Sequence, residues 1–413
     1  MENKSKVSRT ILLVSVMVVL VVCAFGGGFV AGHFLPVGTA AVTTTTPSGS
    51  EAGTPQDLQA TFKPFWEAWQ LVHQDYVDQP VDDNKLMEGA ISGMMQALGD
   101  PHTAYWNVQE TQDWNNALQG QYSGIGAWVN IEGAYLTITE PMSGSPAEAA
   151  GLKTGDQIIA VDGQDVTGID PDVVRQTKVL GPAGTDVTLT IQRQGVDTPF
   201  DVTITRAVIV VPSVESKMLD NNIAYIKISI FGESTAQDFH DQLSQLMAKN
   251  PSGLILDLRN NGGGYLTAAV DVASEFIDSG VILYEQSGDG SLQSYEAKPG
   301  GLALNLPVVV LVNEYTASAS EIVSGALRDH GRAQLVGVKT YGKGTVQMPF
   351  TLSNGGEAHI TVDRWLTPNK QLIDKVGLTP DVVVQLTQAD ITANKDPQLD
   401  QAIKTLQQII SGH

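Results

Sequence analysis

Residues 306–322 read LPVVVLVNEYTASASEI, and this stretch decides the fold. It begins with a continuous run of β-branched residues, which is typical of a strand buried on both faces of a sheet. Apolar residues then recur at helical spacing from Ile322 onward, until Arg328 and Gly331 supply the basic last turn and the stop of a helix. Ser318 is therefore predicted to lie on a strand-to-helix turn, as in an α/β fold.

Ser318 is the first candidate for catalysis. The free amides and the positive dipole at the start of a helix would face the negative charge of a tetrahedral intermediate in acyl transfer. A serine at this place still needs a base, and the downstream segment YGKGTVQ, residues 341–347, offers Lys343 between two glycines. Desolvation can lower the pKa of a lysine until its amine is neutral near working pH. Gln347 could orient that amine by hydrogen bonding.

The same serine also has a purely structural interpretation. Ser318 and Glu321 have the Ser-x-x-Glu spacing of a helix capping box, in which the hydroxyl only satisfies a backbone amide. A lysine between glycines is usually a turn residue. The residues of these two segments leave both interpretations open.

A family resemblance favours catalysis. Residues 310–347 read VLVNEYTASASEIVSGALRDHGRAQLVGVKTYGKGTVQ. They resemble the nucleophile-to-lysine segment of the C-terminal processing peptidases, also called tail-specific proteases. The resemblance implies that Ser318 is the nucleophile, Lys343 the base and Gln347 the residue that orients the base. His330 and His359 do not lie where that family places catalysis, so neither is expected to pair with the serine.

A second glycine-rich segment follows another predicted buried strand. Residues 253–264 read GLILDLRNNGGG and lead into an apolar helix over 267–276. Glycines in such a turn free backbone amides to face a substrate, and the Gly-Lys-Ser/Thr ending of a phosphate loop is missing. The segment resembles the Asp-Leu-Arg-x-Asn-x-Gly-Gly motif of the same peptidases. This implies an oxyanion hole made by the amides of Gly263 and Ala319, with Gly264 as the alternative to Gly263.

From about Tyr122 to Arg206 the pattern changes to short strands broken by glycine. Two strings, YSGIGAWV and GSPAEAAGLKTGDQIIAVDGQDV, resemble a PDZ domain of bacterial proteases. In such a domain a peptide adds as a strand to a sheet edge, and the amides of a glycine loop bind its C-terminal carboxylate. The resemblance implies that these peptide-binding amides belong to Gly124, Ile125, Gly126 and Ala127. Leu180 stands where the family often has an arginine, which puts arginine-mediated coupling to the active site in doubt.

The N-terminus carries a predicted membrane anchor. Residues 11–33 contain no Asp, Glu, Lys or Arg, and at ~1.5 Å per residue a helix of this length reaches across a ~30 Å hydrocarbon core. The basic residues of segment 1–10 predict that this tail stays in the cytoplasm and that the rest of the chain is extracytoplasmic. A cleavable signal peptide and a lipid anchor at Cys23 are the alternatives. Residues 34–60 are rich in Thr, Ser, Pro and Gly and are predicted to be a flexible linker.

Four units are predicted to follow the linker: a helical region over 61–118, the inserted PDZ domain over 119–207, the peptidase core over 208–390 and a C-terminal helix within 391–413. In the first unit, an amphipathic helix over about 61–78 is expected to bury an aromatic stripe. The members of this stripe are Trp66, Trp69, Val72 and Tyr76. A second helix should turn four residues inward, namely Leu86, Ala90, Met94 and Leu98. His102, in a GDPHTAYW string that also resembles the family, is interpreted as a turn or packing residue.

Composition narrows the function further. The net charge of −21 argues against a nucleic-acid partner, and a single cysteine excludes an intrachain disulfide. The resemblance implies an α/β fold with a ClpP/crotonase-like protease core, an inserted PDZ domain and an N-terminal transmembrane helix.

The implied activity is that of a single-pass membrane serine endopeptidase that cleaves proteins near their C-termini, without metal or cofactor. Its partners would be proteins or peptides with exposed C-terminal tails, and the sequence leaves a homo-oligomer open. A catalytically silent peptide-binding scaffold and a crotonase-type acyl-CoA enzyme are the alternatives.

Overall fold

A six-stranded sheet forms the centre of the α/β core. The computed structural model describes residues 54–131, 134–387, 390 and 395–412. In this part the strand order is β10-β11-β12-β15-β16-β19; β10 is antiparallel to β11 and the other neighbours are parallel. The strands are β10 (Val214–Leu219), β11 (Ile223–Ile228), β12 (Gly253–Asp257), β15 (Val308–Val312), β16 (Ala333–Gly337) and β19 (Val382–Val383). The buried strands predicted around residues 223–228, 253–258 and 306–312 are confirmed.

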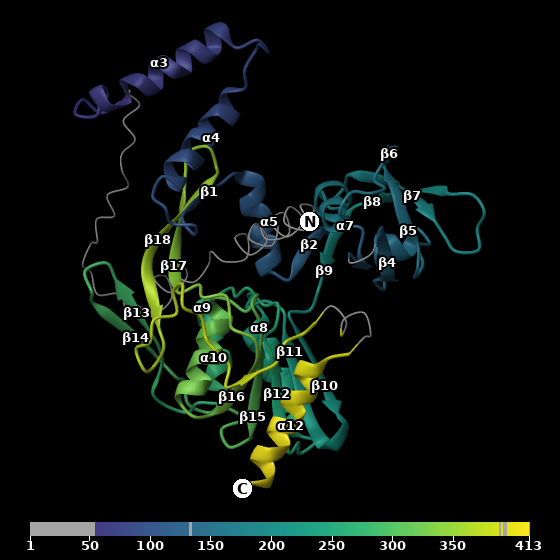
Figure 1. The fold of residues 1–413 in the computed structure, drawn as a ribbon, viewed down its shortest axis with the longest axis vertical. Coiled ribbons are helices and arrows are strands. Elements are labelled where there is room, and N and C mark those ends of the chain that lie inside the picture. The colour runs from purple at the N-terminus through teal and green to yellow at the C-terminus, as the bar shows by residue number, and fades with distance from the viewer. Residues whose placement is uncertain (1–53, 132–133, 388–389, 391–394, 413) are drawn as a thin grey trace, which may run out of the picture.

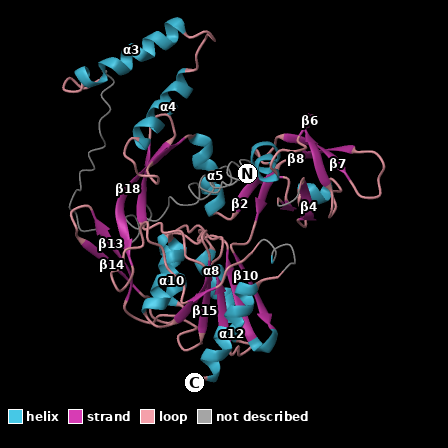
Figure 2. Ribbon diagram, viewed as in Figure 1, coloured by secondary structure: helices cyan, strands magenta, loops and turns pink. Residues whose placement is uncertain are grey.

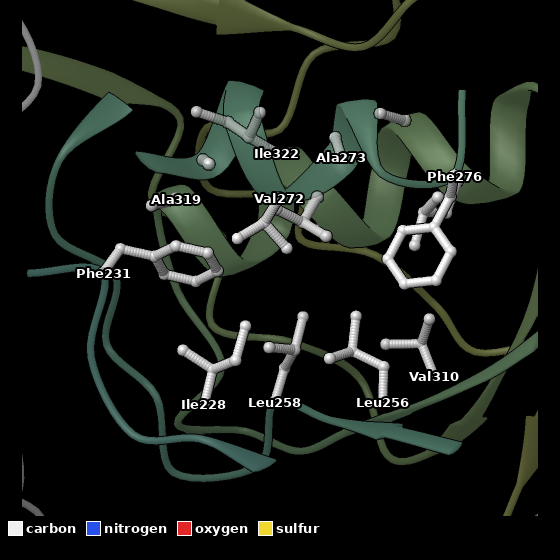
Figure 3. Close-up of a cluster of buried hydrophobic side chains, with 14 of the residues drawn as sticks. Ile228, Phe231, Leu256, Leu258, Val272, Ala273, Phe276, Val310, Ala319 and Ile322 are labelled. Atoms are coloured by element: carbon white, nitrogen blue, oxygen red, sulfur yellow. The ribbon is translucent and has the colours of Figure 1, made fainter. Parts of the chain in front are cut away.

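Helices cover both faces of this sheet (Figure 1). Figure 3 shows one of these faces, where side chains such as Leu256 and Val310 pack against Val272 and Ile322 of the helices. On β15, Val308 and Val310 pack into the cluster that contains residues of three helices, whereas Val309 faces the C-terminal helix. The three helices are α8 (Thr235–Met247), α9 (Leu266–Ser274) and α10 (Ala319–Asp329), and the C-terminal one is α12 (Pro397–Ser411). Since both faces are covered, the strand is apolar at every position rather than at alternate ones.

A second, antiparallel sheet carries the lysine segment. Its order is β1-β18-β13-β14, and β17 also pairs with β18. The bounds are β1 (Ala104–Trp106), β13 (Val281–Ser287), β14 (Leu292–Glu296), β17 (Thr345–Thr351) and β18 (Glu357–Leu366). Because β1 pairs with β18, the GDPHTAYW string is brought to the hairpin that follows Lys343.

The inserted domain leaves the core after α5 (Val108–Leu118) through an antiparallel ribbon of β2 (Gln121–Gly124) and β9 (Ala207–Val210). It has its own sheet and its own buried cluster, and it lies to one side of the core (Figures 1 and 2). Its strands are β3 (Ala127–Asn130), β4 (Leu136–Pro141), β5 (Gln157–Val161), β6 (Gln164–Asp165), β7 (Asp186–Gln192) and β8 (Phe200–Thr205). Its helices are α6 (Pro146–Ala149), α7 (Pro171–Val174) and the π-helical turn η1 (Arg175–Val179); a 3-10 turn, η2 (Asp220–Asn222), follows β10 in the core.

The two N-terminal helices form as predicted, but the prediction of what they bury is wrong. The first, α3 (Gln59–Asp75), has no buried residue, and Trp66 is 51% exposed. It projects away from the core (Figure 1), and the rings of Phe65, Trp66 and Trp69 contact one another instead. Amphipathic spacing identifies an apolar face, but it does not show what covers that face.

The second helix, α4 (Asp83–Gln96), is rotated by about one position from the prediction. Met94 is 57% exposed and Leu98 66% exposed, whereas Met95 is only 6% exposed and packs near Tyr105 and Ala358. The side of α4 that faces inward is therefore the side that packs against β1 and β18. The C-terminal helix predicted within 391–413 is confirmed as α12.

The predicted membrane anchor, Cys23 and most of the predicted linker lie outside the described residues. Helix α3 begins at Gln59, so the last two residues of the predicted linker, 59 and 60, belong to this helix. Of the helices within the described part of the chain, none combines the length and the apolar character that a membrane span needs.

Candidate active site

Ser318 has a strained backbone at the turn between β15 and α10. Its φ is 54° and its ψ −118°, a region that residues with a side chain rarely adopt. The neighbouring residues hold this conformation, because the Ala317 amide donates to the Asn261 carbonyl at 3.0 Å and the Thr316 hydroxyl donates to the Leu258 carbonyl at 2.9 Å. Thr316 and Ala317 are fully buried, whereas Ser318 is partly exposed. The turn therefore presents the serine at the surface of a rigid support.

The glycine loop lies directly against this serine. A Cβ atom at Gly263 would be 2.8 Å from the Cβ of Ser318 and 3.0 Å from the amide nitrogen of Ala319. Ala319 is the first residue of α10, whose opening amides have no partner within the helix. The structure thus brings together Ser318, Ala319 and Gly263 as the sequence predicts.

The two glycines proposed as alternatives differ in their contacts. The Gly263 amide donates to Asn261 Oδ1 at 2.9 Å. An oxyanion that used this amide would have to take the place of the asparagine oxygen. Gly264 forms a bridge with Phe231, and the Phe231 amide donates to the Gly263 carbonyl at 2.8 Å. The choice between the two amides therefore stays open.

Glu321 joins the serine turn to the lysine segment. Its Oε2 accepts from the amides of Ser318 at 3.0 Å and Lys343 at 2.9 Å, and its Oε1 accepts from the Gly342 amide at 2.8 Å and the Thr340 hydroxyl at 2.5 Å. Because two of these amides share one oxygen, the backbone nitrogens of Ser318 and Lys343 lie within about 6 Å of each other. The capping box that the Ser-x-x-Glu pattern predicts is present. Of the four contacts of the Glu321 carboxylate, this pattern predicts only the one with the Ser318 amide.

The Lys343 side chain is buried, with 1% of its surface exposed. Burial disfavours the charged form of an amine, which is the condition that a lysine base requires. Gln347 is also 1% exposed, and its amide nitrogen donates to the hydroxyls of Thr345 and Thr361 at 2.9 Å each. Its oxygen Oε1 accepts no hydrogen bond from the residues that the structure describes. Gln347 is thereby fixed with a buried acceptor available to an amine.

The pKa of Glu321 gives a testable pH dependence of stability. Burial raises this pKa from 4.5 to about 7, against the opposing effect of the hydrogen bonds to Thr340, Gly342, Lys343 and Ser318. Between pH 4.5 and 7 the folded chain therefore keeps a proton that the unfolded chain has lost. The free energy of unfolding should fall as pH rises through this window, by up to about 1.4 kcal/mol per pH unit.

This decline should disappear in Glu321→Gln, which has no proton to lose. The measurement is denaturant unfolding of the wild type and the variant at several pH values from 4.5 to 8. The slopes are compared rather than the absolute stabilities, because glutamine replaces one acceptor oxygen by a donor. Parallel slopes in the two proteins would contradict the assignment.

His102 was missed by the sequence analysis as a neighbour of the site. Its pKa is lowered to about 4, first by burial and next by the positive charge of Lys343. Thr103, beside it, donates to Asp100 Oδ2 at 2.7 Å and accepts from the Thr361 amide at 3.1 Å. The GDPHTAYW string thus contacts Thr361, whose hydroxyl also accepts a hydrogen bond from Gln347. The interpretation of His102 as a packing residue is incomplete, and only the resemblance of its string to the family pointed to this place.

The other two histidines have different environments. His330 follows the last turn of α10, at the opposite end of the helix from Ser318, and its Nε2 lies 2.8 Å from the Val281 carbonyl. His359 is fully buried, with its ring centroid 3.7 Å from that of Trp106 and its Nε2 3.0 Å from Glu357 Oε2. These contacts agree with the expectation that neither histidine serves the serine.

The inserted domain has an apolar cavity of about 420 Å³ between β3 and η1. Ile125 and Ala127 line it, together with Leu180 and Arg175. The Ala147 amide donates to the Ile125 carbonyl at 2.8 Å and the Met142 amide to the Gly126 carbonyl at 3.0 Å. Gly126 has a φ of 76°, and a Cβ there would lie 2.5 Å from the side chain of Ser145. The predicted loop is thus tightly held at the rim of the cavity.

Arg206 occupies the space beside the turn where the family arginine is missing. Its guanidinium donates to the Val179 carbonyl at 2.8 Å and to the Lys178 carbonyl at 2.9 Å. A Cβ at Gly181 would lie 2.9 Å from this guanidinium. Leu180 itself lines two adjoining cavities, one of them in contact with α5. An arginine from the end of β8 therefore holds the turn that contains Leu180.

The expected absence of a metal stays a prediction. Across the described ranges, His, Cys, Asp and Glu side chains form no group of three or more that could hold a metal ion.

Comparison with known proteins gives matches to three family models. Peptidase family S41 matches residues 222–384, the PDZ domain model matches residues 137–193, and the model of the activating protease CtpB N-terminal domain matches residues 20–111. The first match contains the serine turn, the glycine loop and the lysine segment. The second lies within the inserted domain.

Relatives that are similar over most of the chain agree with these matches. The carboxy-terminal-processing protease of Bartonella bacilliformis is 36% identical over 363 residues, which cover 86% of this chain and 82% of that protein. The carboxy-terminal processing protease CtpA of Bacillus subtilis is 38% identical over 321 residues, which cover 78% and 68%. A solved structure, a putative S41 protease from Bacteroides fragilis, has a TM-score of 0.56 at 17% identity and covers 87% of this chain and 99% of its own. At that identity the likeness concerns the fold alone.

Proposed function

Because this chain belongs to peptidase family S41, as a C-terminal processing serine protease with a PDZ domain, we propose that Ser318 is its nucleophile and Lys343 its general base. The observation that carries the proposal is the carboxylate of Glu321, which accepts hydrogen bonds from the backbone of both residues. Gln347 would accept from the lysine amine through its buried Oε1. The Ala319 amide and that of Gly263 or Gly264 would bind the oxyanion.

The proposed reaction proceeds in two steps. Lys343 takes the proton of the Ser318 hydroxyl as the oxygen attacks the substrate carbonyl, and it returns that proton to the leaving amine. Water, activated by the same neutral amine, then hydrolyses the acyl-enzyme ester and restores the serine. A ClpP/crotonase-like core, which we propose for this α/β fold, would explain why two strand-to-helix turns converge on one carbonyl. The family match is to peptidases, which argues against the acyl-CoA alternative.

The PDZ domain would select the substrate by its C-terminal tail. A tail would add as a strand beside β3, place its last side chain in the cavity and its carboxylate at the amides of residues 124–127. The cavity, with its apolar lining and Ile125 and Ala127 on its wall, supports this proposal.

The tail proposal is tested by filling the groove. In Ala127→Trp the indole would occupy the cavity, so KM for a peptide with a long C-terminal tail should rise about tenfold, while kcat/KM for a short reporter stays within about twofold. The measurement is a digest of both substrates by the full-length chain, with fluorophosphonate labelling of Ser318 as a check on the catalytic site.

Val196→Trp is the matched control, because Val196 is exposed in the β7–β8 loop of the same domain. Equal effects of Ala127→Trp on the two substrates would speak against recognition through the groove. If the wild type were neither labelled nor able to digest either substrate, the result would instead favour a catalytically silent peptide-binding scaffold.

We also propose that residues 11–33 anchor the chain in the cell membrane as a single span, with the catalytic part extracytoplasmic. The support is the uncharged length of this segment and the basic residues before it. Release of the intact chain from membranes by alkaline carbonate would contradict the anchor.

A further inference from the structure

Arg259 stands between the end of β12 and the glycine loop, and the reaction proposed above does not use it. Its backbone amide and its Nε both donate to Asp257 Oδ1 at 3.0 Å, and its Nη2 donates to Asp257 Oδ2 at 2.6 Å. The Tyr225 hydroxyl donates to the same carboxylate at 2.7 Å. The guanidinium is therefore held firmly against the last residue of a central strand.

The other side of the guanidinium binds the C-terminal helix. Nη1 donates to Asp396 Oδ1 at 2.9 Å and Nη2 to Asp396 Oδ2 at 2.8 Å, a bidentate contact. Asp396 is the N-cap of α12 and also accepts from the Leu399 amide at 2.9 Å. Burial alone would raise the pKa of Asp396, but the hydrogen bonds from Arg259 and from the Leu399 amide hold it below its usual range. Helix α12 is thus docked onto the residue that begins the loop.

The contacts continue from Arg259 along the loop to the serine. The Asn260 amide donates to Asn313 Oδ1 at 2.9 Å, and Asn313 Nδ2 donates back to Asn260 Oδ1 at 2.7 Å. The Asn261 carbonyl accepts from the Ala317 amide at 3.0 Å and from the Ser320 hydroxyl at 2.9 Å. Each residue between Arg259 and Gly262 is therefore fixed to the turn on either side of Ser318.

We propose that Arg259 is a positioning residue which, clamped between Asp257 and Asp396, sets the place of the glycine-loop amides relative to Ser318, so that docking of α12 is part of the active-site architecture. The inference rests on the proposed catalytic role of Ser318. It extends beyond the S41 family match, which ends at residue 384 and does not include α12.

The expected effect follows from the planar, forked shape of the Arg259 guanidinium, which binds the carboxylates of Asp257 and Asp396 at the same time. In Arg259→Lys the charge stays, but an ammonium cannot make bidentate contacts with both carboxylates. In Asp396→Asn one charged acceptor of the fork is lost. A shift of the loop by about 1 Å would misplace the oxyanion donors, and misplacement of this size can cost about 10²-fold in rate. We expect kcat to fall about 10- to 100-fold in each variant, with KM within about threefold.

The experiment measures kcat and KM for a short reporter, the melting temperature and the affinity for a peptide boronic acid. The tetrahedral adduct that a boronic acid forms with a serine occupies the oxyanion position, so its affinity should fall by the same factor as kcat. The kcat of the double variant Arg259→Lys/Asp396→Asn should lie within about twofold of that of the less active single variant. Both changes break the same set of contacts, so their effects should not add.

Arg332→Lys is the matched control. The Arg332 guanidinium donates to the carbonyls of Phe276, Ala303 and Leu306, near the start of β15 and thus at the opposite end of that strand from Ser318. It should lower the melting temperature without changing kcat.

If the wild type is active, three outcomes would overturn this inference and leave the proposed function intact. They are an unchanged kcat in both clamp variants, an unchanged boronate affinity, or an equal loss of kcat in Arg332→Lys at the same loss of melting temperature. A wild type that neither cleaves the reporter nor binds the boronate would overturn the proposed function, and the inference with it.

Discussion

Replacing Lys343 by methionine is expected to lower kcat/KM by on the order of 10⁴-fold, because Ser318 would lose the base that takes its proton. Methionine fills nearly the same volume as the buried lysine, so the loss should not come from a cavity. The measurement is kcat/KM for a short reporter together with the rate of fluorophosphonate labelling. Ser318→Ala should cost about as much, and the double variant no more than either, since the two groups act as one unit.

The control for this prediction is Lys339→Met, which removes an exposed lysine four residues earlier in the chain. It should leave both rates unchanged. If Lys343→Met kept its labelling rate, another group would have to be the base. His102 would be the first to examine, because burial, the larger cause of its lowered pKa, remains without Lys343 and keeps the imidazole neutral near pH 7.

The local parts of this site could be predicted, but the way they are joined could not. The β-branched run before Ser318 and the helical spacing after it are short-range patterns, and both elements formed where they were expected. Glu321 shows the limit of such patterns. Its spacing from Ser318 predicts the capping contact, whereas its other three donors come from residues 340–343 and meet it only after the two sheets have packed.

The same limit explains the errors at the N-terminus. The aromatic residues of α3 have the periodicity of a buried face, but burial depends on a partner, and none of the described elements covers Trp66. Conversely, His102 and Arg259 have no periodicity that marks them. The importance of His102 comes from the electrostatic effect of Lys343 on its pKa, and that of Arg259 from its hydrogen bonds to Asp396. Both partners lie far away in the sequence.

Replacing Gly263 by alanine is expected to lower kcat by about 10²- to 10³-fold. The clash would displace the glycine-loop amides, whether that of Gly263 or that of Gly264 binds the oxyanion, and this is the usual cost of losing one oxyanion donor. The residue has a φ of 110°, and the added Cβ would lie 2.8 Å from Ser318 Cβ, 3.0 Å from the Ala317 carbonyl oxygen and 3.0 Å from the Ala319 amide nitrogen. Two of these neighbours are backbone atoms and the third is the first carbon of the nucleophile, so relief requires the serine and the loop to move apart. KM should change less than kcat, since the clash is at the reacting carbonyl rather than along the tail.

Gly300→Ala separates this clash from the cost of the backbone conformation. Gly300 has a φ of 101°, almost the same as Gly263, but a Cβ there would meet no atom within 4 Å. Its alanine variant should lose about 1–2 kcal/mol of stability from the unfavourable φ and keep its kcat. The decisive comparison is kcat at matched fractions of folded protein. If Gly263→Ala and Gly300→Ala lost activity equally, the loop would act only through stability; if Gly263→Ala alone lost kcat and fluorophosphonate labelling together, the contact of Gly263 with Ser318 would be part of the catalytic geometry.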